Sequence, residues 1–160
     1  MEKENKIVFG EGCFWNTEEV FREIKGVVRT TVGYMGGDEK KYSNPTYEQV
    51  SSNETGFVEV CLVEFNPKII SFSKLLELFW KSHNPTERNR QGLDFGTQYK
   101  SVIFYYSAKQ KKEAEQSKKE EQKKYRKEII TEIRKVGEFY KAEDYHQKYL
   151  MKRGLKSCRI

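Results

Sequence analysis

The segment Ile7-Val8-Phe9-Gly10-Glu11-Gly12-Cys13-Phe14-Trp15 places a short apolar run directly before a cysteine and two aromatic residues. Residues 14–24 then carry apolar side chains at helical spacing, so the pattern predicts a strand, a turn and a helix. Cys13 lies at the start of this helix, where the helix dipole and unpaired backbone N–H groups favour thiolate over thiol. Cys13 is therefore a candidate nucleophile, with Phe14 and Trp15 suited to hold a small apolar group beside its sulfur. The local pattern is equally compatible with three residues that pack a helix onto a sheet.

Predicted strands and helices alternate along the rest of the chain. Turn-forming residues bound strands at 27–34, 57–65, 101–106 and 129–133, a helix that starts near 71, a charged helix over 108–125 and a short helix at 142–151. Several links between strands are too short for a crossover helix. We therefore expect an α/β (α+β) fold, a two-layer α/β sandwich with helices on a mixed sheet, rather than a doubly wound parallel sheet. With 160 residues and no internal linker, the chain is expected to form one domain, residues 1–160.

Composition limits the compartment and the chemistry. The first apolar run ends at Phe9 and is too short for a signal peptide, and no stretch is long and apolar enough to span a bilayer, so a cytoplasmic location without membrane association is expected. The three cysteines, Cys13, Cys61 and Cys158, are odd in number and lack C-x-x-C spacing. This spacing argues against a disulfide scaffold and a zinc knuckle. With two histidines and no ligand spacing, no metal site is expected.

The basic charge of the chain is concentrated in one segment. The formal net charge is +6, and residues 108–128 hold nine Lys or Arg and five Glu, a net +4. Glu115 and Lys119, like Glu120 and Lys124, have the i,i+4 spacing that supports an exposed helix. The mixed signs and the lack of interleaved aromatic residues favour a solvated helix over a nucleic-acid surface. A basic nucleic-acid-binding module remains the alternative from another functional class.

Glu59 occupies the middle of an apolar strand, a costly place for a carboxylate unless it is paired, protonated or functional. If its face is buried, its proton affinity should rise, as a general acid near neutral pH requires. The alternation of the strand instead groups Glu59 with Cys61 and Val63 on the solvent side. The residues alone therefore favour an exposed Glu59.

Three further polar residues lie in loops of the kind that lines active sites. Tyr47 ends the segment Asn44-Pro45-Thr46-Tyr47, and Tyr99 ends Asp94-Phe95-Gly96-Thr97-Gln98-Tyr99. Phenols in such loops can donate hydrogen bonds to a polarised oxygen, although a tyrosine among ten is more often a packing residue. Asp94, flanked by Gly92 and Gly96, is either a turn former or a carboxylate that positions a ligand.

Six motifs occur in order along the chain, and together they are specific. They are Gly12-Cys13-Phe14-Trp15, Gly33-Tyr34 with Gly36-Gly37, Asn44-Pro45-Thr46-Tyr47, Gly56-x-x-Glu59, Asp94-x-Gly96-x-Gln98-Tyr99 with Ser101, and Glu143-x-Tyr145-His146-Gln147. Over residues 6 to about 150 the sequence closely resembles the A class of peptide methionine sulfoxide reductases. The resemblance implies a two-layer sandwich related to the ferredoxin-like topology, no bound cofactor, and reduction of the S epimer of methionine sulfoxide in proteins or as the free amino acid.

The resemblance also implies roles for the candidate residues. Cys13 attacks the sulfoxide sulfur while Phe14 and Trp15 hold the substrate methyl group. Glu59, Tyr47 and Tyr99 bind and protonate the sulfoxide oxygen, and Asp94 orients a water molecule or the substrate. The physical need is clear, because a sulfoxide oxygen is a poor leaving group until it is protonated.

The oxidised Cys13 must be reduced again. In the resembled family a C-terminal cysteine often attacks the sulfenic acid, and Cys158 is the candidate, on a mobile tail of residues 152–160. Thioredoxin then reduces the Cys13–Cys158 disulfide by exchange. The alternative is that Cys158 is a chance terminal thiol, and Cys61 is interpreted as a packing residue. The enzyme is expected to act as a monomer on oxidised proteins, and a peroxide-reducing thiol enzyme is a further alternative.

The sequence departs from the family pattern at two places. Phe57 stands where the family often has His, and Asn16 stands where some members have a second Cys, which argues against a three-cysteine relay. His146 is interpreted as structural, and His83 as a residue at a helix end.

Overall fold

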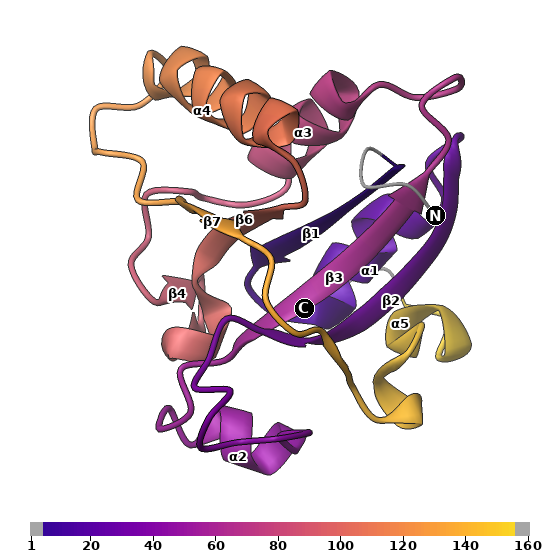
Figure 1. The fold of residues 1–160 in the computed structure, drawn as a ribbon, viewed down its shortest axis with the longest axis vertical. Helices are drawn as coiled ribbons and strands as arrows, with labels where there is room; N and C mark the ends of the chain where they lie inside the picture. Colours follow the sequence, from indigo (N-terminus) through magenta and orange to yellow (C-terminus); the bar gives the residue numbers. More distant parts are fainter. Residues whose placement is uncertain (1–4, 156–160) are drawn as a thin grey trace.

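One mixed sheet organises the computed structural model, which describes residues 5–155 (Figure 1). The strands are β1 (Lys6–Glu11), β2 (Val27–Met35), β3 (Val58–Phe65), β6 (Ser101–Tyr105), β7 (Glu132–Lys135) and β8 (Tyr140–Lys141), in the spatial order β7-β6-β1-β3-β2-β8. The β6–β7 pair is parallel, and the other neighbouring pairs are antiparallel. The predicted mixed sheet, with helices packed on it, is confirmed.

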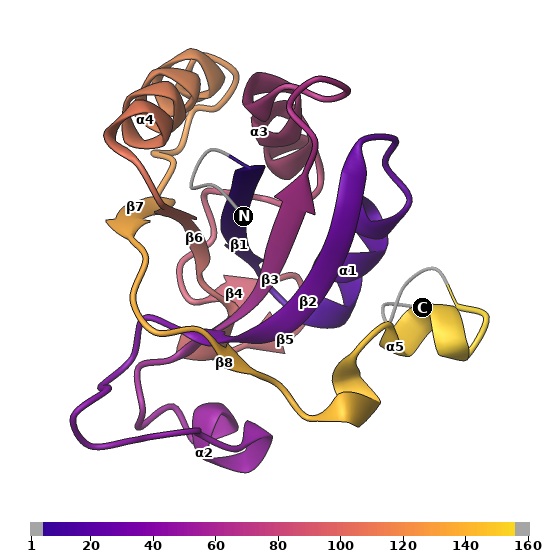
Figure 2. The ribbon, with the colours of Figure 1, turned by 45° about the vertical axis from the view of Figure 1, so that its right-hand side comes forward.

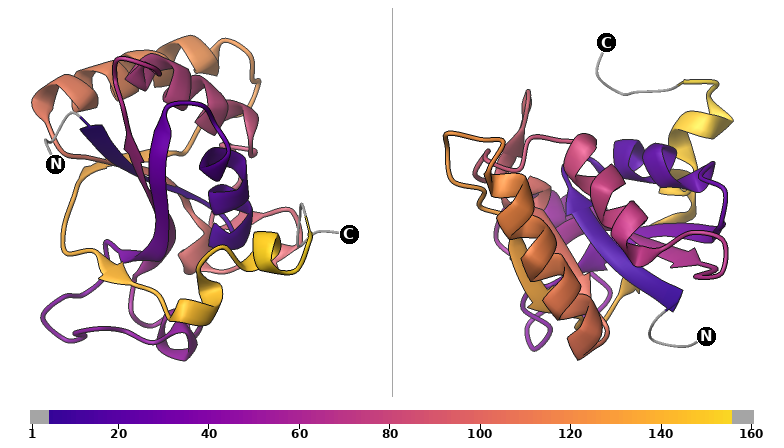
Figure 3. Two further views of the ribbon diagram at one scale, coloured as in Figure 1. Left: turned by 90° about the vertical axis from the view of Figure 1, so that its right-hand side faces the viewer. Right: turned by 90° about the horizontal axis from the view of Figure 1, so that it is seen from above.

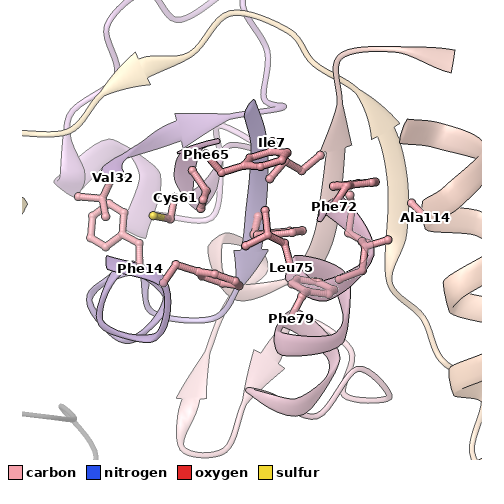
Figure 4. Packing of buried hydrophobic residues seen from close by; sticks show 14 of the residues in the cluster. Ile7, Phe14, Val32, Cys61, Phe65, Phe72, Leu75, Phe79 and Ala114 are labelled. Carbon is pink, nitrogen blue, oxygen red and sulfur yellow. The ribbon is translucent and has the colours of Figure 1, made fainter. Parts of the chain in front are cut away.

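Helices cover one face of the sheet. Helix α1 (Phe14–Arg22) lies over β2 and β3, and α3 (Phe72–Lys81) packs against α4 (Ala108–Gln122). The main core forms beneath them, where the ring of Phe9 on β1 stacks with Phe21 at 5.1 Å and with Phe79 at 4.8 Å. Figure 4 shows this cluster, with the sulfur of Cys61 among hydrocarbon side chains.

The opposite face of the sheet is also covered. Its buried side chains, contributed by β1, β2, β3 and β6, pack against Val136 and Phe139 in the segment between β7 and β8. Figure 1 shows this segment crossing the sheet in front of β3. Both faces of β3 are therefore buried, which matters for the placement of Glu59.

Helix boundaries follow from local chemistry. The side chain of Ser71 caps α3 by accepting a hydrogen bond from the N–H of Lys74 at 3.0 Å. A similar cap starts α2 (Tyr47–Ser51), where Thr46 and Gln49 bond each other's backbone N–H groups as a capping box. The sequence predicts a loop here. The charged helix α4 buries Gln110 and Ala114 and exposes most of its length, as predicted.

Three smaller elements complete the region near the start of α1. Strands β4 (Arg90–Gln91) and β5 (Asp94–Phe95) form a short hairpin, and a 3-10 helix, η2 (Thr97–Tyr99), follows it. Figure 2 shows this hairpin at the end of the molecule where α1 begins.

The C-terminal part differs from prediction. The expected helix at 142–151 is two short pieces, η3 (Asp144–His146) and α5 (Tyr149–Lys152), because Lys148 adopts a left-handed conformation with φ 52°. The expected strand at 129–133 is β7, which begins three residues later at Glu132. Figure 3 shows α5 beside α1. Between residues 5 and 155, no helix has the length and apolar character needed to cross a membrane.

Candidate active site

Cys13 lies at the turn between β1 and α1. It is the N-cap residue of α1, and its carbonyl oxygen accepts hydrogen bonds from the N–H groups of Asn16 at 3.1 Å and Thr17 at 3.4 Å. Gly12 makes the turn with φ 107°, a conformation that glycine adopts without steric cost. The side chain of Cys13 is 8% exposed. The predicted position of Cys13 at the start of a helix, the positive end of the helix dipole, is confirmed.

Glu59 is buried, so the exposed position favoured by strand alternation is wrong. Its side chain is 1% exposed, and its Oε1 accepts a hydrogen bond from the backbone N–H of Phe14 at 3.2 Å. Glu59 shares a face of β3 with Cys61 and Val63, and that face is covered by α1 rather than by water. The prediction from alternation failed because the opposite face of β3, which carries Val58 and Val60, is buried as well.

The two loop tyrosines approach the same place. Burial raises the pKa of Tyr47, and the charges of Glu59 and Cys13 raise it further. Burial also raises the pKa of Tyr99, with Glu59 as the next contribution and Asp94 as a smaller one. Charges act in this way over short distances, so Cys13, Glu59, Tyr47 and Tyr99 form one group. Both phenols keep their protons at neutral pH and are available as hydrogen-bond donors.

His146 holds the indole of Trp15. The Nε1–H of Trp15 donates a hydrogen bond to His146 Nδ1 at 2.9 Å, which requires an unprotonated Nδ1. Burial lowers the pKa of His146 from 6.5, although the charge of Glu143 opposes the shift. The imidazole is 1% exposed, and its centroid lies 5.1 Å from that of Phe14 and 4.6 Å from that of Tyr47. The interpretation of His146 as a structural residue is incomplete, because its ring contacts three of the candidate site residues.

The outer face of Trp15 is covered by α5. The indole stacks on Tyr149 with ring centroids 3.6 Å apart and an angle of 3° between the planes. The guanidinium of Arg153 lies 3.7 Å from the centroid of the Tyr149 ring. These contacts place three planar groups in one stack at the edge of the site.

Glu143 connects the site to the sheet. One carboxylate oxygen accepts a hydrogen bond from the hydroxyl of Tyr34 at 2.9 Å, and the other accepts from the backbone N–H of Tyr47 at 3.1 Å. Burial alone raises the pKa of Glu143, but the hydrogen bonds it accepts outweigh burial and leave the pKa below 4.5.

Gln147 and Glu18 fix the C-terminal segment. The amide of Gln147 bonds both the N–H and the carbonyl of Val32, each at 2.9 Å, in the manner of a neighbouring strand. The carboxylate of Glu18 accepts from the N–H of Lys148 at 2.5 Å and from the hydroxyl of Thr30 at 2.7 Å. The sequence pattern assigned no role to these residues, although Gln147 ends the motif Glu143-x-Tyr145-His146-Gln147.

His83 joins the segments before Cys13 and after Tyr99. Its Nδ1 lies 3.1 Å from Glu11 Oε2, and its Nε2 lies 2.7 Å from Ser101 Oγ. Glu11 and Ser101 are paired residues of β1 and β6. His83 is therefore more than the helix-end residue expected, because it ties two strand ends together beneath the site.

Of the other two cysteines, the structure describes only Cys61. Cys61 is fully buried, and burial raises the pKa of its thiol, which agrees with a packing role. Cys158 lies outside the described residues 5–155. In that described range, no group of three or more His, Cys, Asp or Glu side chains is arranged to hold a metal ion.

Comparisons with known proteins agree with this geometry. The family model for peptide methionine sulfoxide reductase matches residues 5–160. The peptide methionine sulfoxide reductase MsrA of Methanosarcina acetivorans is 53% identical over 151 residues, which cover 93% of this chain and 79% of the relative.

Two solved structures show the same fold. Methionine sulfoxide reductase A of Corynebacterium diphtheriae has a TM-score of 0.91 and 34% identity, and the match covers 99% of this chain and 79% of that one. Mxr1 from Saccharomyces cerevisiae in complex with Trx2 has a TM-score of 0.63 and 29% identity, and that match covers 90% of this chain and 83% of the yeast chain. From its sequence, fold and site together, this chain belongs to the peptide methionine sulfoxide reductase family.

Proposed function

We propose that Cys13 is the nucleophile of a peptide methionine sulfoxide reductase that acts on the S epimer of methionine sulfoxide. The observation that carries this proposal is the hydrogen bond from the N–H of Phe14 to Glu59 Oε1 at 3.2 Å. It fixes a buried carboxyl group one residue from the thiol. Burial favours the neutral form of a carboxylic acid, which is the form that donates a proton.

The first half of the reaction transfers the sulfoxide oxygen to Cys13. The thiolate attacks the sulfoxide sulfur while Glu59 gives its proton to the oxygen, and the hydroxyls of Tyr47 and Tyr99 donate hydrogen bonds to it. The attack forms a bond between Cys13 Sγ and the substrate sulfur. That bond and the sulfur–oxygen bond then break as the protonated oxygen transfers to Sγ, so methionine leaves and Cys13 becomes a sulfenic acid. Cys13 gives up two electrons, and these electrons reduce methionine sulfoxide to methionine.

Phe14 and Trp15 bind the substrate methyl group in this proposal. Phe14 is fully buried, and the indole of Trp15 is held by His146 on its edge and by Tyr149 on its face. A pocket fixed in this way, opposite a single proton donor, accepts one handedness at sulfur. Asp94 lies near Tyr99 and orients a water molecule or the substrate main chain.

The second half of the reaction regenerates the thiol. Cys158 attacks the sulfenic acid, water leaves, and a Cys13–Cys158 disulfide forms, which thioredoxin reduces by exchange. The likeness to yeast Mxr1, which was solved with Trx2, supports thioredoxin as the reductant. Helix α5 ends at Lys152, beside the stack on Trp15, and Cys158 follows six positions later in the sequence.

The remaining parts of the proposal concern the working form of the enzyme. We infer a single domain over residues 1–160 that acts as a monomer on oxidised proteins, without a bound cofactor. An odd number of cysteines and a thiol-based cycle both suit the reducing cytoplasm.

A coupled assay tests the proposal directly. Purified protein is supplied with thioredoxin, thioredoxin reductase, NADPH and separated epimers of a methionine sulfoxide peptide. We expect turnover of the S epimer alone, complete loss in Cys13→Ser, and retention in Cys61→Ala, the control for the buried packing cysteine. Equal rates on both epimers, or substantial activity of Cys13→Ser, would overturn it.

A further inference from the structure

The β4–β5 hairpin presents two exposed apolar side chains. Leu93 at the turn is 89% exposed, and Phe95 is 61% exposed. The hairpin pairs Arg90 with Phe95 and Gln91 with Asp94. In the sequence, Asp94 lies between the two apolar residues. Large apolar side chains with this exposure, grouped beside a candidate active site, are typical of a binding surface.

The hairpin is held rigidly from below. Gln91 is 1% exposed, and its side-chain amide bonds both the N–H of Asn84 at 3.0 Å and the carbonyl of Asn84 at 2.7 Å. The guanidinium of Arg90 lies 4.3 Å from the centroid of the Phe95 ring and bonds the carbonyl of Gly92 at 2.7 Å. A partner that binds here therefore loses little of the hairpin's conformational freedom.

The hairpin is continuous with the candidate site. Two residues after Phe95, the chain enters η2, which carries Tyr99. The N–H of Thr97 at the start of η2 bonds Asn53 Oδ1 at 2.9 Å, just beyond the helix that begins with Tyr47. Figure 2 shows the hairpin at the same end of the molecule as the start of α1. A polypeptide that places one residue between Tyr47 and Tyr99 has to pass close to this hairpin.

We propose that Leu93 and Phe95 bind apolar residues that flank the methionine sulfoxide in an unfolded polypeptide substrate. Methionine is often buried in folded proteins, so loss of the fold exposes it together with other apolar residues of the former core. The two side chains recognise this feature, which free methionine sulfoxide lacks. The inference rests on the proposed function of Cys13 and names the form of substrate that its site prefers.

The test compares three substrates with dithiothreitol as the reductant. They are free methionine (S)-sulfoxide, a peptide with Leu and Val on either side of the sulfoxide residue, and the same peptide with Ser at those places. The variants are Leu93→Ser, Phe95→Ser and the double substitution. Ile69→Ser is the matched control, since Ile69 is 55% exposed in the loop before α3.

We expect the double variant to raise the KM for the apolar peptide about tenfold, from lost burial of apolar surface. Its kcat, its kinetics on free methionine sulfoxide and its thermal midpoint stay unchanged, and Ile69→Ser behaves as wild type. An equal rise for the Ser-flanked peptide, or no rise for either peptide, would overturn the proposal.

Two other outcomes also reject it. A fall in turnover of free methionine sulfoxide would show that the hairpin supports the catalytic group instead of the flanking residues. A higher KM for thioredoxin in the coupled assay with thioredoxin and its reductase, together with unchanged peptide kinetics in dithiothreitol, would assign the surface to the reductant. Failure of the proposed function itself looks different, because wild-type protein would then not reduce free methionine (S)-sulfoxide at all.

Discussion

Glu59 Oε1 accepts a hydrogen bond from the backbone N–H of Phe14 at 3.2 Å, and this bond joins the start of β3 to the first residue of α1. An N–H in the first turn of a helix has no partner within the helix, so a carboxyl group satisfies it well. The same contact sets the distance between the candidate acid and the candidate nucleophile. Because the donor is a backbone N–H, the position of Glu59 does not depend on the side chain of Cys13.

Glu59→Gln separates proton donation from this structural role. The amide oxygen of Gln still accepts the N–H of Phe14, but the side chain has no acidic proton to give. We expect the single-turnover rate to fall by about 10²- to 10⁴-fold with little change in substrate affinity. Rapid-quench measurement of methionine formation checks this. Glu64→Gln, a buried carboxylate at the end of the same strand, is the control and should leave the rate unchanged.

His146 is expected to act through Trp15. His146→Asn keeps an acceptor near the position of Nδ1, whereas His146→Leu removes it and leaves the indole N–H without a partner. One hydrogen bond of this kind contributes about 1 kcal/mol, so the KM of the Leu variant should rise about fivefold while the Asn variant stays near wild type. Steady-state kinetics and indole fluorescence provide the measurement. Equal KM values for the two variants would contradict this role.

The same residue predicts a dependence of stability on pH. Burial lowers the pKa of His146 below 6.5 in the folded state, so on acidification the unfolded chain takes up the proton first. The free energy of unfolding therefore falls as the pH drops below about 6.5 and levels off below the folded pKa. Urea unfolding at pH 7.5 and 5.5 should show a larger loss for wild type than for His146→Asn. An identical pH dependence would show that His146 does not contribute.

Gly37 is expected to tolerate no side chain. A Cβ there would lie 2.3 Å from Cδ2 of Phe57, which is fully buried just before β3. Gly37→Ala should cost about 1–3 kcal/mol in the free energy of unfolding, because the ring has no room to move. Gly137→Ala is the control, since its Cβ would meet the flexible end of Glu39 and should change stability by less than about 0.5 kcal/mol.

Cys158→Ser tests the second half of the proposed cycle. The first turnover uses Cys13 alone, so one equivalent of methionine should still form. Recycling by thioredoxin should stop, and mass spectrometry should find a sulfenic acid on Cys13 in the variant and a Cys13–Cys158 disulfide in wild type. A disulfide between Cys13 and Cys61, or normal recycling of the variant, would refute the resolving role of Cys158.

The sequence predicted the elements that depend on local pattern. The run before Cys13, the apolar stripe of α3 and the i,i+4 pairs of α4 each specify their element within a few residues, and the mixed sheet follows from the short links. Helix α2 was not predicted, although Thr46 and Gln49 form a capping box. Such a box marks a helix start even in a loop rich in polar residues.

The site was harder to predict, since its geometry depends on contacts across the chain. Alternation in β3 indicates which residues share a face with Glu59, but the covering of both faces depends on α1 and on the segment near Phe139. The role of His146 was missed for the same reason. Its partner Trp15 lies far away in sequence, and no local pattern joins the two residues.

The bond between Trp15 and His146 spans 131 positions in the sequence. Closing a loop of that size carries an entropic cost that must be met before the contact stabilises the fold. A chain that has formed only its local helices therefore has a cysteine without its carboxylic acid, its phenols or its fixed indole. The reactive arrangement arises only when folding is nearly complete, so the thiol of a damaged or unfinished molecule is not held in the arrangement that this chemistry requires.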